Sequence, residues 1–300
     1  MTDHGGCATT MTSTEFRITS RDGLPLACVR WDSNCPVRGV VQIAHGMGEH
    51  IGRYAGLIEA LTSSGVIVYG NDHRGHGRSA PTASQVGDFG AGGFDSLVED
   101  MVRLSQTVKK ELPDKPFLLF GHSMGSFAAQ QYVLDHSREI DGLILSGSGV
   151  LDGLSRVARS APSSSNILNA RFEPARTPFD WLSRDQAMVD RFIADPLCFA
   201  QLQPASLASF LAAAPRLADP ASLRKIRADL PVYLFSGSED PVGQQLSGVQ
   251  SLVERYRKAG IYNITHDFYS GGRHEMLNET NRPEVLRNLL SWVSAVLHKV

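Results

Sequence analysis

One short segment near the middle of the chain constrains the fold more than any other. Residues 121–125 read G-H-S-M-G; they follow the apolar run 117–120 and precede a helix-like stretch at 126–134. A serine between two glycines, at a turn from a strand into a helix, is typical of a nucleophile elbow, whose strained turn presents the hydroxyl above a sheet. Glycines are required there because side chains would collide with the strand and the helix. The segment therefore predicts a serine nucleophile, Ser123, at the carboxyl end of a strand.

Strand-like and helix-like segments alternate on both sides of this turn. From residue 40 onward the strand-like runs are almost continuously apolar, and helix-like segments separate them. That alternation is typical of a mostly parallel sheet with helices on both faces, so we expect an α/β fold. The first two runs flank a turn at 20–23 and predict an antiparallel hairpin. The expected strands, eight in all, lie at 15–19, 24–31, 40–44, 66–69, 117–120, 142–145, 232–235 and 264–269.

The alternation is interrupted between the strands at 142–145 and 232–235. A gap of about 85 residues far exceeds an ordinary crossover connection, so it predicts an inserted unit. Apolar residues at helical spacing occur within it, at Leu207, Phe210, Leu211, Ala214 and Leu217. We therefore expect a disordered tail over 1–14, a core built from 15–147 and 228–300, and an inserted helical cap or lid over 148–227.

Charge and composition narrow the class of partner. The formal net charge of -2 gives no basic field to attract nucleic acid, which we therefore exclude as a partner. The four cysteines, Cys7, Cys28, Cys35 and Cys198, show no C-x-x-C spacing, so free thiols in a reducing compartment are expected. Neither a secretory signal nor an apolar run of the roughly 20 residues that span a bilayer is found. The predicted location is the cytoplasm, and no feature predicts an oligomeric state.

The predicted nucleophile requires a base, because a serine hydroxyl is a poor nucleophile at neutral pH. On a sheet of this kind the partners follow in the order serine, acid, histidine. Three histidines lie in or after the last strands. His266 belongs to a strand and His298 lies two residues from the C-terminus, whereas His274 lies in a glycine-rich loop at a strand's carboxyl end. His274 is the expected base.

An acid must hold that base in the correct tautomer. The strand at 232–236 runs into a turn-rich loop that carries Asp240, with Glu239 beside it as the reserve choice. Asp267 is embedded in a strand and less able to reach. Asp240 could merely start a turn with Pro241. That explanation does not account for the serine, acid and histidine loops, which follow in the expected chain order and all lie at the carboxyl ends of strands. We predict a triad of Ser123, Asp240 and His274.

The tetrahedral intermediate of acyl transfer also needs two hydrogen-bond donors for its oxyanion, each contributing about 3 to 4 kcal/mol. One is expected to be the backbone N–H of Met124, which follows the nucleophile. The other should come from the loop 45–50 after the third strand, where small glycines allow a close approach to the serine. We assign it to the backbone N–H of Met47.

Four motifs, taken in order, resemble one known family. Residues 45–54 read H-G-M-G-E-H-I-G-R-Y, 72–79 read D-H-R-G-H-G-R-S, 121–125 hold the serine, and 195–198 read D-P-L-C. Together they resemble the monoacylglycerol lipase and lysophospholipase branch of the α/β-hydrolases, from residue 15 to the C-terminus. Ser126 departs from the pattern, because many relatives carry a third glycine there, and the cap matches least well.

The resemblance implies an α/β-hydrolase fold and a serine carboxylester hydrolase that cleaves lipids with one acyl chain, without a cofactor or a metal. It implies the same triad and supports the oxyanion loop. The implied partner is a small-molecule ester or lipid. Transient membrane contact through the cap is left open as a further expectation, which the resemblance itself does not supply. Six arginines and six acids between 151 and 200 cancel, so the cap shows no clear preference for a charged headgroup.

The strongest competing prediction is an NAD-binding oxidoreductase. Gly46, Gly48 and Gly52 follow a strand and open a helix, and Asp72 closes the next strand where a ribose-binding acid would lie. The glycine spacing departs from G-x-G-x-x-G, however, and an oxidoreductase would leave Ser123 without a role.

Several further functions are compatible with the sequence. His45, His50, His73 and His76 could suggest a metal site, but they lack the spacing of one and more simply fix loop structure. A non-catalytic ligand-binding or interaction protein could share the fold. Among hydrolases, a general esterase, a thioesterase or an aminopeptidase remain; the last would use acids of the cap to bind an amine. The candidate acids are Glu173, Asp180, Asp185 and Asp190.

Overall fold

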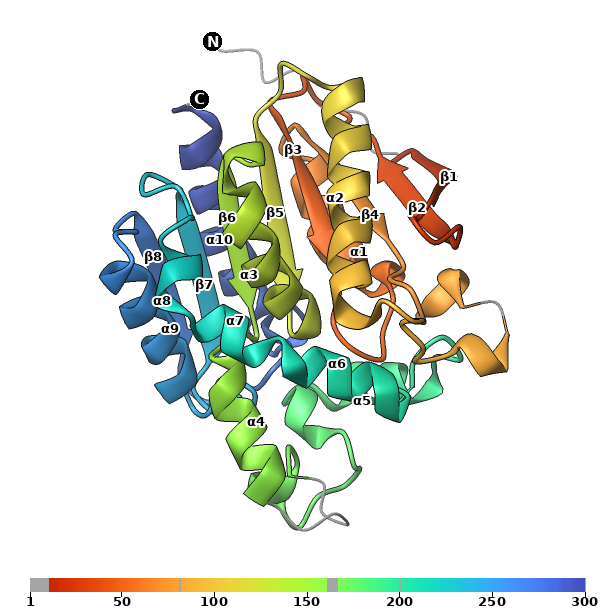
Figure 1. Cartoon of the computed structure of the whole chain (residues 1–300), viewed down its shortest axis with the longest axis vertical. Helices are drawn as coiled ribbons and strands as arrows, with labels where there is room; N and C mark the ends of the chain where they lie inside the picture. Colours follow the sequence, from red (N-terminus) through yellow and green to blue (C-terminus); the bar gives the residue numbers. More distant parts are fainter. Residues whose placement is uncertain (1–10, 81, 161–166, 200, 300) are drawn as a thin grey trace.

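The sheet of the computed structural model, which describes residues 11–80, 82–160, 167–199 and 201–299, has eight strands in the order β1-β2-β4-β3-β5-β6-β7-β8 (Figure 1). β1 pairs antiparallel with β2, and β2 with β4, whereas all other neighbours are parallel. The predicted hairpin and mostly parallel sheet are thus confirmed. The strands are β1 (Ser13–Thr19), β2 (Pro25–Trp31), β3 (Gly39–Ala44), β4 (Val66–Asn71), β5 (Phe117–His122), β6 (Gly142–Ser146), β7 (Val232–Gly237) and β8 (Ile264–Tyr269).

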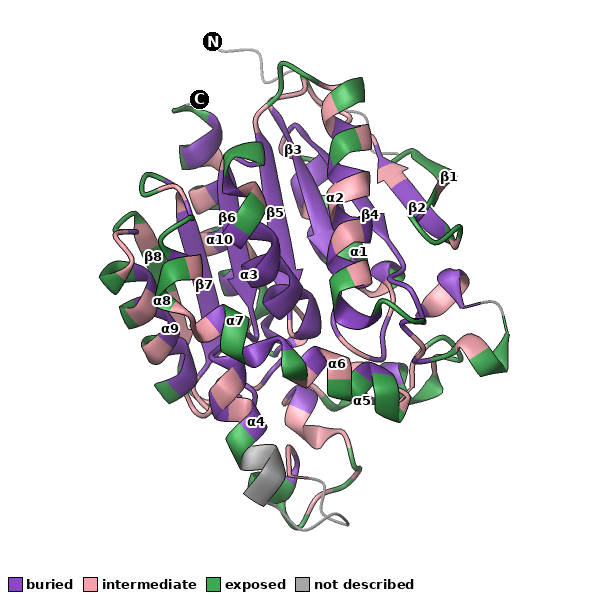
Figure 2. Cartoon of the chain, viewed as in Figure 1, coloured by how far each residue is buried: buried purple, intermediate pink, exposed green. Residues whose placement is uncertain are grey.

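Helices cover both faces of the sheet. One face packs against α2 (Gly93–Glu111), α3 (Met124–His136) and α9 (Ser247–Lys258), and the other against α1 (Ala55–Thr62) and α10 (Arg282–Leu297). The parallel strands β3 to β7 are buried along their whole length (Figure 2), which is why their sequences are almost continuously apolar, whereas the edge strand β8 is partly exposed. No helix among the described residues has the length and apolar character needed to cross a bilayer.

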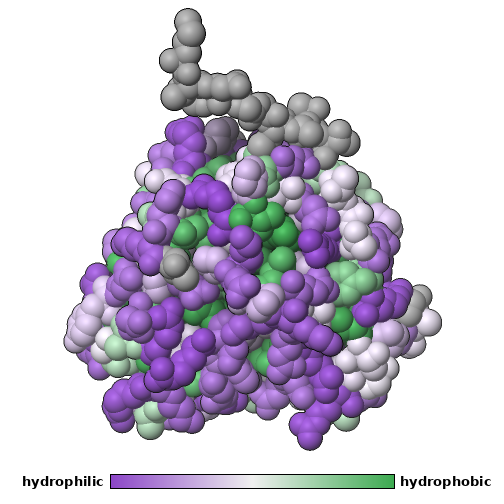
Figure 3. All heavy atoms as spheres, turned by 90° about the horizontal axis from the view of Figure 1, so that it is seen from above, coloured by the Kyte–Doolittle hydropathy of each residue, from purple (hydrophilic) through white to green (hydrophobic). Residues whose placement is uncertain are grey.

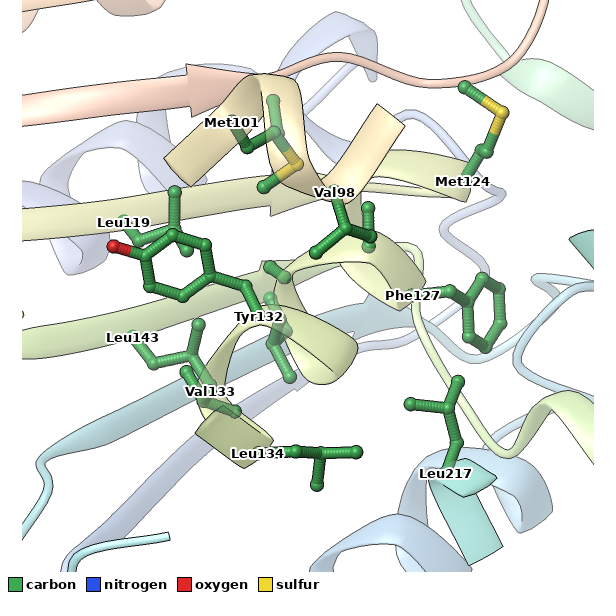
Figure 4. Packing of buried hydrophobic residues seen from close by; sticks show 14 of the residues in the cluster. Val98, Met101, Leu119, Met124, Phe127, Tyr132, Val133, Leu134, Leu143 and Leu217 are labelled. Atoms are coloured by element: carbon green, nitrogen blue, oxygen red, sulfur yellow. The ribbon is translucent and has the colours of Figure 1, made fainter. Parts of the chain in front are cut away.

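Successive residues of one strand pack into the two hydrophobic cores, one on each face of the sheet. Leu119 of β5 belongs to the cluster that includes α2 and α3, and its neighbour Phe120 belongs to the cluster on the opposite face. Figure 4 shows Leu119 packed with Met101 of α2 and Tyr132 of α3. The strand before the predicted nucleophile is therefore held from both sides, so its carboxyl end is a rigid platform.

The segment between β6 and β7 is helical, as expected of a cap, and lies at the carboxyl ends of the strands (Figure 1). Its α-helices are α4 (Leu151–Ser160), α5 (Gln186–Ala194), α6 (Pro204–Ala212), α7 (Ala214–Ala218) and α8 (Pro220–Leu223). Single 3-10 turns occur at η1 (Ile51–Tyr54), η2 (Gly77–Ser79), η3 (Ala83–Gln85), η4 (Ser137–Glu139), η5 (Ala170–Phe172), η6 (Asp180–Leu182) and η7 (Met276–Asn278). The opposite end of the molecule is mostly hydrophilic, with smaller hydrophobic patches between (Figure 3).

Two expectations need correction. β1 already begins at Ser13, inside the tail expected over 1–14, because its residues pair with β2 as far as Trp31; residues 1–10 lie outside the described part of the chain. Cys28 and Cys198 carry free thiols, but Cys35 is disulfide-bonded, so the expectation of free thiols is wrong at that position.

Candidate active site

Ser123 lies at a strained turn between β5 and α3. Its backbone has φ 51° and ψ -122°, a conformation that a residue with a side chain rarely adopts. A Cβ on Gly121 would lie 2.5 Å from the carbonyl oxygen of Gly125, and one on Gly125 would lie 2.2 Å from that of Ala44. Both flanking positions therefore exclude any side chain, which is the packing expected of a nucleophile elbow.

His274 and Asp240 meet at the carboxyl ends of β8 and β7. Nδ1 of His274 lies 2.9 Å from Oδ1 of Asp240, and both side chains are almost fully buried, at 2% and 0% exposure. The amide of Val242 donates to the same Oδ1 at 2.9 Å. Because the carboxylate accepts at Nδ1, the neutral ring carries its proton there and leaves Nε2 free to act as a base.

The electrostatics of His274 come from two opposing effects. Burial is the larger single effect and lowers the pKa, but the charge and hydrogen bond of Asp240, together with Glu275 and Glu49, raise it, and the net pKa is above the usual value. An imidazolium at this position is thus stabilised by carboxylates rather than by water.

The end of β6 connects the serine to the histidine. The amide of Ser123 donates to the carbonyl of Ser146 at 2.9 Å, and a Cβ on the next residue, Gly147, would lie 2.8 Å from Cε1 of His274. The elbow and the histidine loop therefore approach the same strand end. No hydrogen bond among the described residues joins the Ser123 hydroxyl to the ring, and such bonds often tighten only when substrate binds.

The loop after β3 approaches the serine closely. A Cβ on Gly46 would lie 3.1 Å from the Cβ of Ser123. The amide of Gly46 already donates to Glu49, at 2.6 Å, so it is not free for a ligand. Among the described residues, neither the Met47 amide nor the Met124 amide donates a hydrogen bond to a backbone carbonyl in a turn or loop. These two donors, which the sequence singled out, are thus free to bind an anionic oxygen.

A second set of polar residues contacts this loop. His45 is fully buried; its Nε2 accepts from the amide of His73 at 2.9 Å and its Nδ1 lies 2.7 Å from the carbonyl of Gly46. Burial lowers the pKa of His45, and it lowers that of His76 to about 3. Neutral, buried rings of this kind fix the loop, as the sequence suggested.

The glycines that suggested a dinucleotide site are covered by protein. A Cβ on Gly48 would lie 2.1 Å from the carbonyl oxygen of Phe199, whose amide donates to Gly48 at 2.9 Å. Both carboxylate oxygens of Asp72 accept from backbone amides, from Ile51 at 3.0 Å and from Arg78 at 2.8 Å. The loop therefore has no space for a pyrophosphate and no free carboxylate for a ribose, which disfavours NAD binding.

One group of side chains has the composition of a metal site. The ligand atoms of His50, Asp195 and Cys198 lie within 4.8 Å of one another. However, Nδ1 of His50 accepts from the amide of Gly52 at 3.2 Å, so the ring proton lies on Nε2 and is donated to Asp195 at 2.9 Å. A histidine that binds a metal through Nε2 instead carries its proton on Nδ1 and donates it to an acceptor. The geometry favours a hydrogen bond between the loop and the cap over a metal.

Three contacts of the histidine loop were not foreseen from the sequence. The ring of Trp181 in the cap lies 4.9 Å from that of His274, centroid to centroid, and the carbonyl of Leu182 accepts from the amide of Glu275 at 2.8 Å. Glu275 also pairs with Arg53 near the oxyanion loop. Two weak indications of these contacts were present in the sequence: Glu275 directly follows His274, and Arg53 lies in the motif at 45–54.

Comparisons with known proteins agree with this geometry. Residues 35–281 match the family described as Serine aminopeptidase, S33. The chain is 28% identical over 284 residues to the monoacylglycerol lipase of Mycolicibacterium smegmatis, which covers 94% of this chain and 97% of that one. It is 30% identical over 285 residues to the monoglyceride lipase of Mus musculus, covering 92% and 89%.

A solved structure extends the likeness to three dimensions. A thermostable carboxyl esterase from Bacillus coagulans, in complex with glycerol, superimposes with a TM-score of 0.86 at 29% identity, over 96% of this chain and all of that one (100%). The chain therefore belongs to the Serine aminopeptidase S33 family of α/β-hydrolases, in its monoacylglycerol lipase branch.

Proposed function

We propose that the protein is a serine carboxylester hydrolase that cleaves lipid esters with a single acyl chain, of the monoacylglycerol lipase or lysophospholipase type. The observation that supports this most is the buried pair of His274 and Asp240, with Nδ1 and Oδ1 2.9 Å apart, at the strand ends that also present Ser123. The names of the relatives, monoacylglycerol lipase and monoglyceride lipase, support the substrate class.

In the proposed mechanism, Nε2 of His274 takes the proton of the Ser123 hydroxyl as the oxygen attacks the ester carbonyl. The amides of Met47 and Met124 bind the oxyanion, and the collapse of the intermediate leaves an acyl-enzyme. During that collapse His274 gives its proton to the leaving alcohol; it then takes a proton from a water molecule that attacks the acyl-enzyme, and returns this proton to the Ser123 oxygen as the fatty acid leaves. Asp240 stabilises the imidazolium in both halves, and no cofactor or metal takes part.

The cap is the proposed contact with lipid. Ile193 of α5 is 47% exposed, and Leu197, just beyond that helix, is 38% exposed. Exposed aliphatic side chains on a cap over a lipid-binding site favour transient contact with a membrane surface. The expected cytoplasmic location stays a prediction.

An aminopeptidase activity is less well supported. Asp185 and Asp190 pair with Arg282 and Arg176, and Asp180 accepts from Thr177 and from a backbone amide, so these acids are already occupied. Such carboxylates have little left with which to bind a substrate amine.

Turnover of monoacylglycerols, lysophospholipids, simple esters of graded acyl length and an aminoacyl anilide tests the proposal. We expect hydrolysis of the single-chain lipid esters with an optimum chain length, no anilide cleavage, and loss of all turnover in Ser123→Ala. Full activity of the Ser123→Ala variant would contradict the mechanism, and a preference for the anilide would contradict the substrate class.

A further inference from the structure

The oxyanion loop is held by a buried carboxylate. Oε1 of Glu49 accepts from the amide of Gly46 and from the hydroxyl of Tyr54, both at 2.6 Å. Oε2 of the same carboxylate accepts from Nη1 of Arg53 at 2.7 Å. The Gly46 peptide directly precedes the Met47 amide of the proposed oxyanion hole. The position of that amide therefore depends on Glu49.

The histidine loop is held by the same guanidinium, whose Nη1 donates to both Glu49 and Glu275. Nη1 and Nη2 of Arg53 donate to the two oxygens of Glu275, at 2.6 and 2.8 Å, and Asn278 donates to the second oxygen at 2.8 Å. Glu275 directly follows His274 in the chain. Arg53 thus joins two loops that lie more than 200 residues apart in the chain, since its separation from Glu275 is 222 residues.

The three side chains are buried, which makes this arrangement unusual. Glu49, Arg53 and Glu275 expose 5%, 8% and 6% of their side chains. Buried ion pairs repay their desolvation only when geometry and further hydrogen bonds are nearly complete, and apolar residues of similar volume often stabilise a fold as well or better. Stability alone is therefore a poor reason for such a group beside an active site.

On these contacts, and resting on the proposed function, we propose that Glu49, Arg53 and Glu275 act as positioning residues. They form a bridge that holds the ring of His274 and the Met47 amide in fixed relative positions. Bidentate Arg–carboxylate pairs suit this task because their planar geometry fixes orientation as well as distance.

The bridge also adds a charge near the base. Two carboxylates and one guanidinium leave a net charge of -1. The ionisable groups that face His274 are Asp240, Glu275, Glu49 and His122, whose ring lies 4.8 Å away. Burial and the charge of His274 lower the pKa of His122 to about 4, so His122 is neutral at the working pH. After Asp240, Glu275 and Glu49 are the charges that raise the pKa of His274.

Two substitutions separate the position from the charge. Glu275→Gln removes one negative charge, so the pKa of His274 falls and the acidic limb of kcat/KM should move to lower pH by about one unit. Arg53→Lys keeps the net charge but loses the bidentate geometry. We expect it to lower kcat about 10- to 100-fold with the midpoint of that limb unchanged. Glu239→Gln, at an exposed carboxylate next to Asp240, is the matched control and should change neither quantity.

The outcomes are distinguishable from those that test the proposed function. Wild-type ester turnover that needs Ser123 is established first, with the same short-chain ester for all variants. A Glu275→Gln variant with an unchanged pH midpoint, or a folded Arg53→Lys variant with wild-type kcat, would overturn the bridge while leaving the hydrolase assignment intact. If Glu275→Gln does not fold, Arg53→Lys and Glu49→Gln provide the same two readouts, since Glu49→Gln also removes one negative charge.

Discussion

Replacing Asp240 by asparagine isolates the charge behind His274. Oδ1 of Asp240 accepts from both Nδ1 of His274 and the amide of Val242, at 2.9 Å each, whereas Oδ2 has one hydrogen-bond partner among the described residues, the hydroxyl of Ser236 at 3.5 Å. An asparagine therefore keeps its carbonyl oxygen at the Oδ1 position, where it accepts both donors. The tautomer of His274 is preserved, and only the negative charge is lost.

The size of the effect follows from the distance. Opposite unit charges 2.9 Å apart attract by about 6 kcal/mol at an effective dielectric constant of about 20. This is the largest stabilisation that Asp240 can give to the imidazolium formed during catalysis. Since each 1.36 kcal/mol corresponds to about a factor of ten in rate, we expect Asp240→Asn to lower kcat by 10³- to about 10⁴-fold, with KM changed little.

The pH profile of activity tests separately whether the charge of Asp240 raises the pKa of His274. In the wild-type protein the carboxylate raises the pKa of His274 above its usual value, against burial, which lowers it. Without the charge, burial dominates, so the acidic limb of kcat/KM should move to lower pH. Stopped assays of a short-chain ester from pH 5 to about pH 9 measure both effects, with circular dichroism to confirm folding and Glu239→Gln as control. An Asp240→Asn variant that keeps a tenth or more of the wild-type kcat would refute the assignment of Asp240.

Three further predictions concern the scaffold, metals and the cap. Gly125→Ala should lower the melting temperature by several degrees or prevent folding, because the new Cβ would lie 2.2 Å from the carbonyl oxygen of Ala44. The control Gly56→Ala, in α1 with open space around it, should instead raise the free energy of unfolding by about 0.5 to 1 kcal/mol. Equal effects of the two substitutions would contradict the packing argument. Dialysis against EDTA should leave ester turnover unchanged, and loss restored by Zn²⁺ would contradict the metal-free mechanism. Replacing Ile193 and Leu197 by serine should weaken sedimentation with phospholipid vesicles while hydrolysis of a water-soluble ester persists; unchanged sedimentation would remove the cap from the membrane contact.

The sheet could be predicted because its signal is local. Continuous apolar runs reported strands buried on both faces, and the two glycines around Ser123 reported a turn with no space for side chains. Chain order and strand ends were enough to select His274 and Asp240, because the carboxyl ends of parallel strands meet at one edge. The hydrogen bond between the two supports the choice of Asp240 over Glu239, which instead pairs with Arg171 at the surface.

The remaining features depend on contacts between segments far apart in the chain. The pairing of Arg53 with Glu275 spans 222 residues, and neither side chain belongs to a pattern that predicts the other. The contact of Trp181 with His274 depends on how the cap folds back over the core. Periodicity identifies elements and their buried faces, but it carries no information about which buried charges meet.

The central claim is that Ser123 is the nucleophile of an ester hydrolase and is activated by His274. Labelling with a fluorophosphonate probe, followed by peptide mass spectrometry, tests it most directly. We expect a single adduct on the peptide that contains Ser123, formed faster as pH rises through the pKa of His274, and competed by a monoacylglycerol. An adduct on another residue, or labelling of Ser123 at an equal rate in a folded His274→Ala variant, would contradict the account.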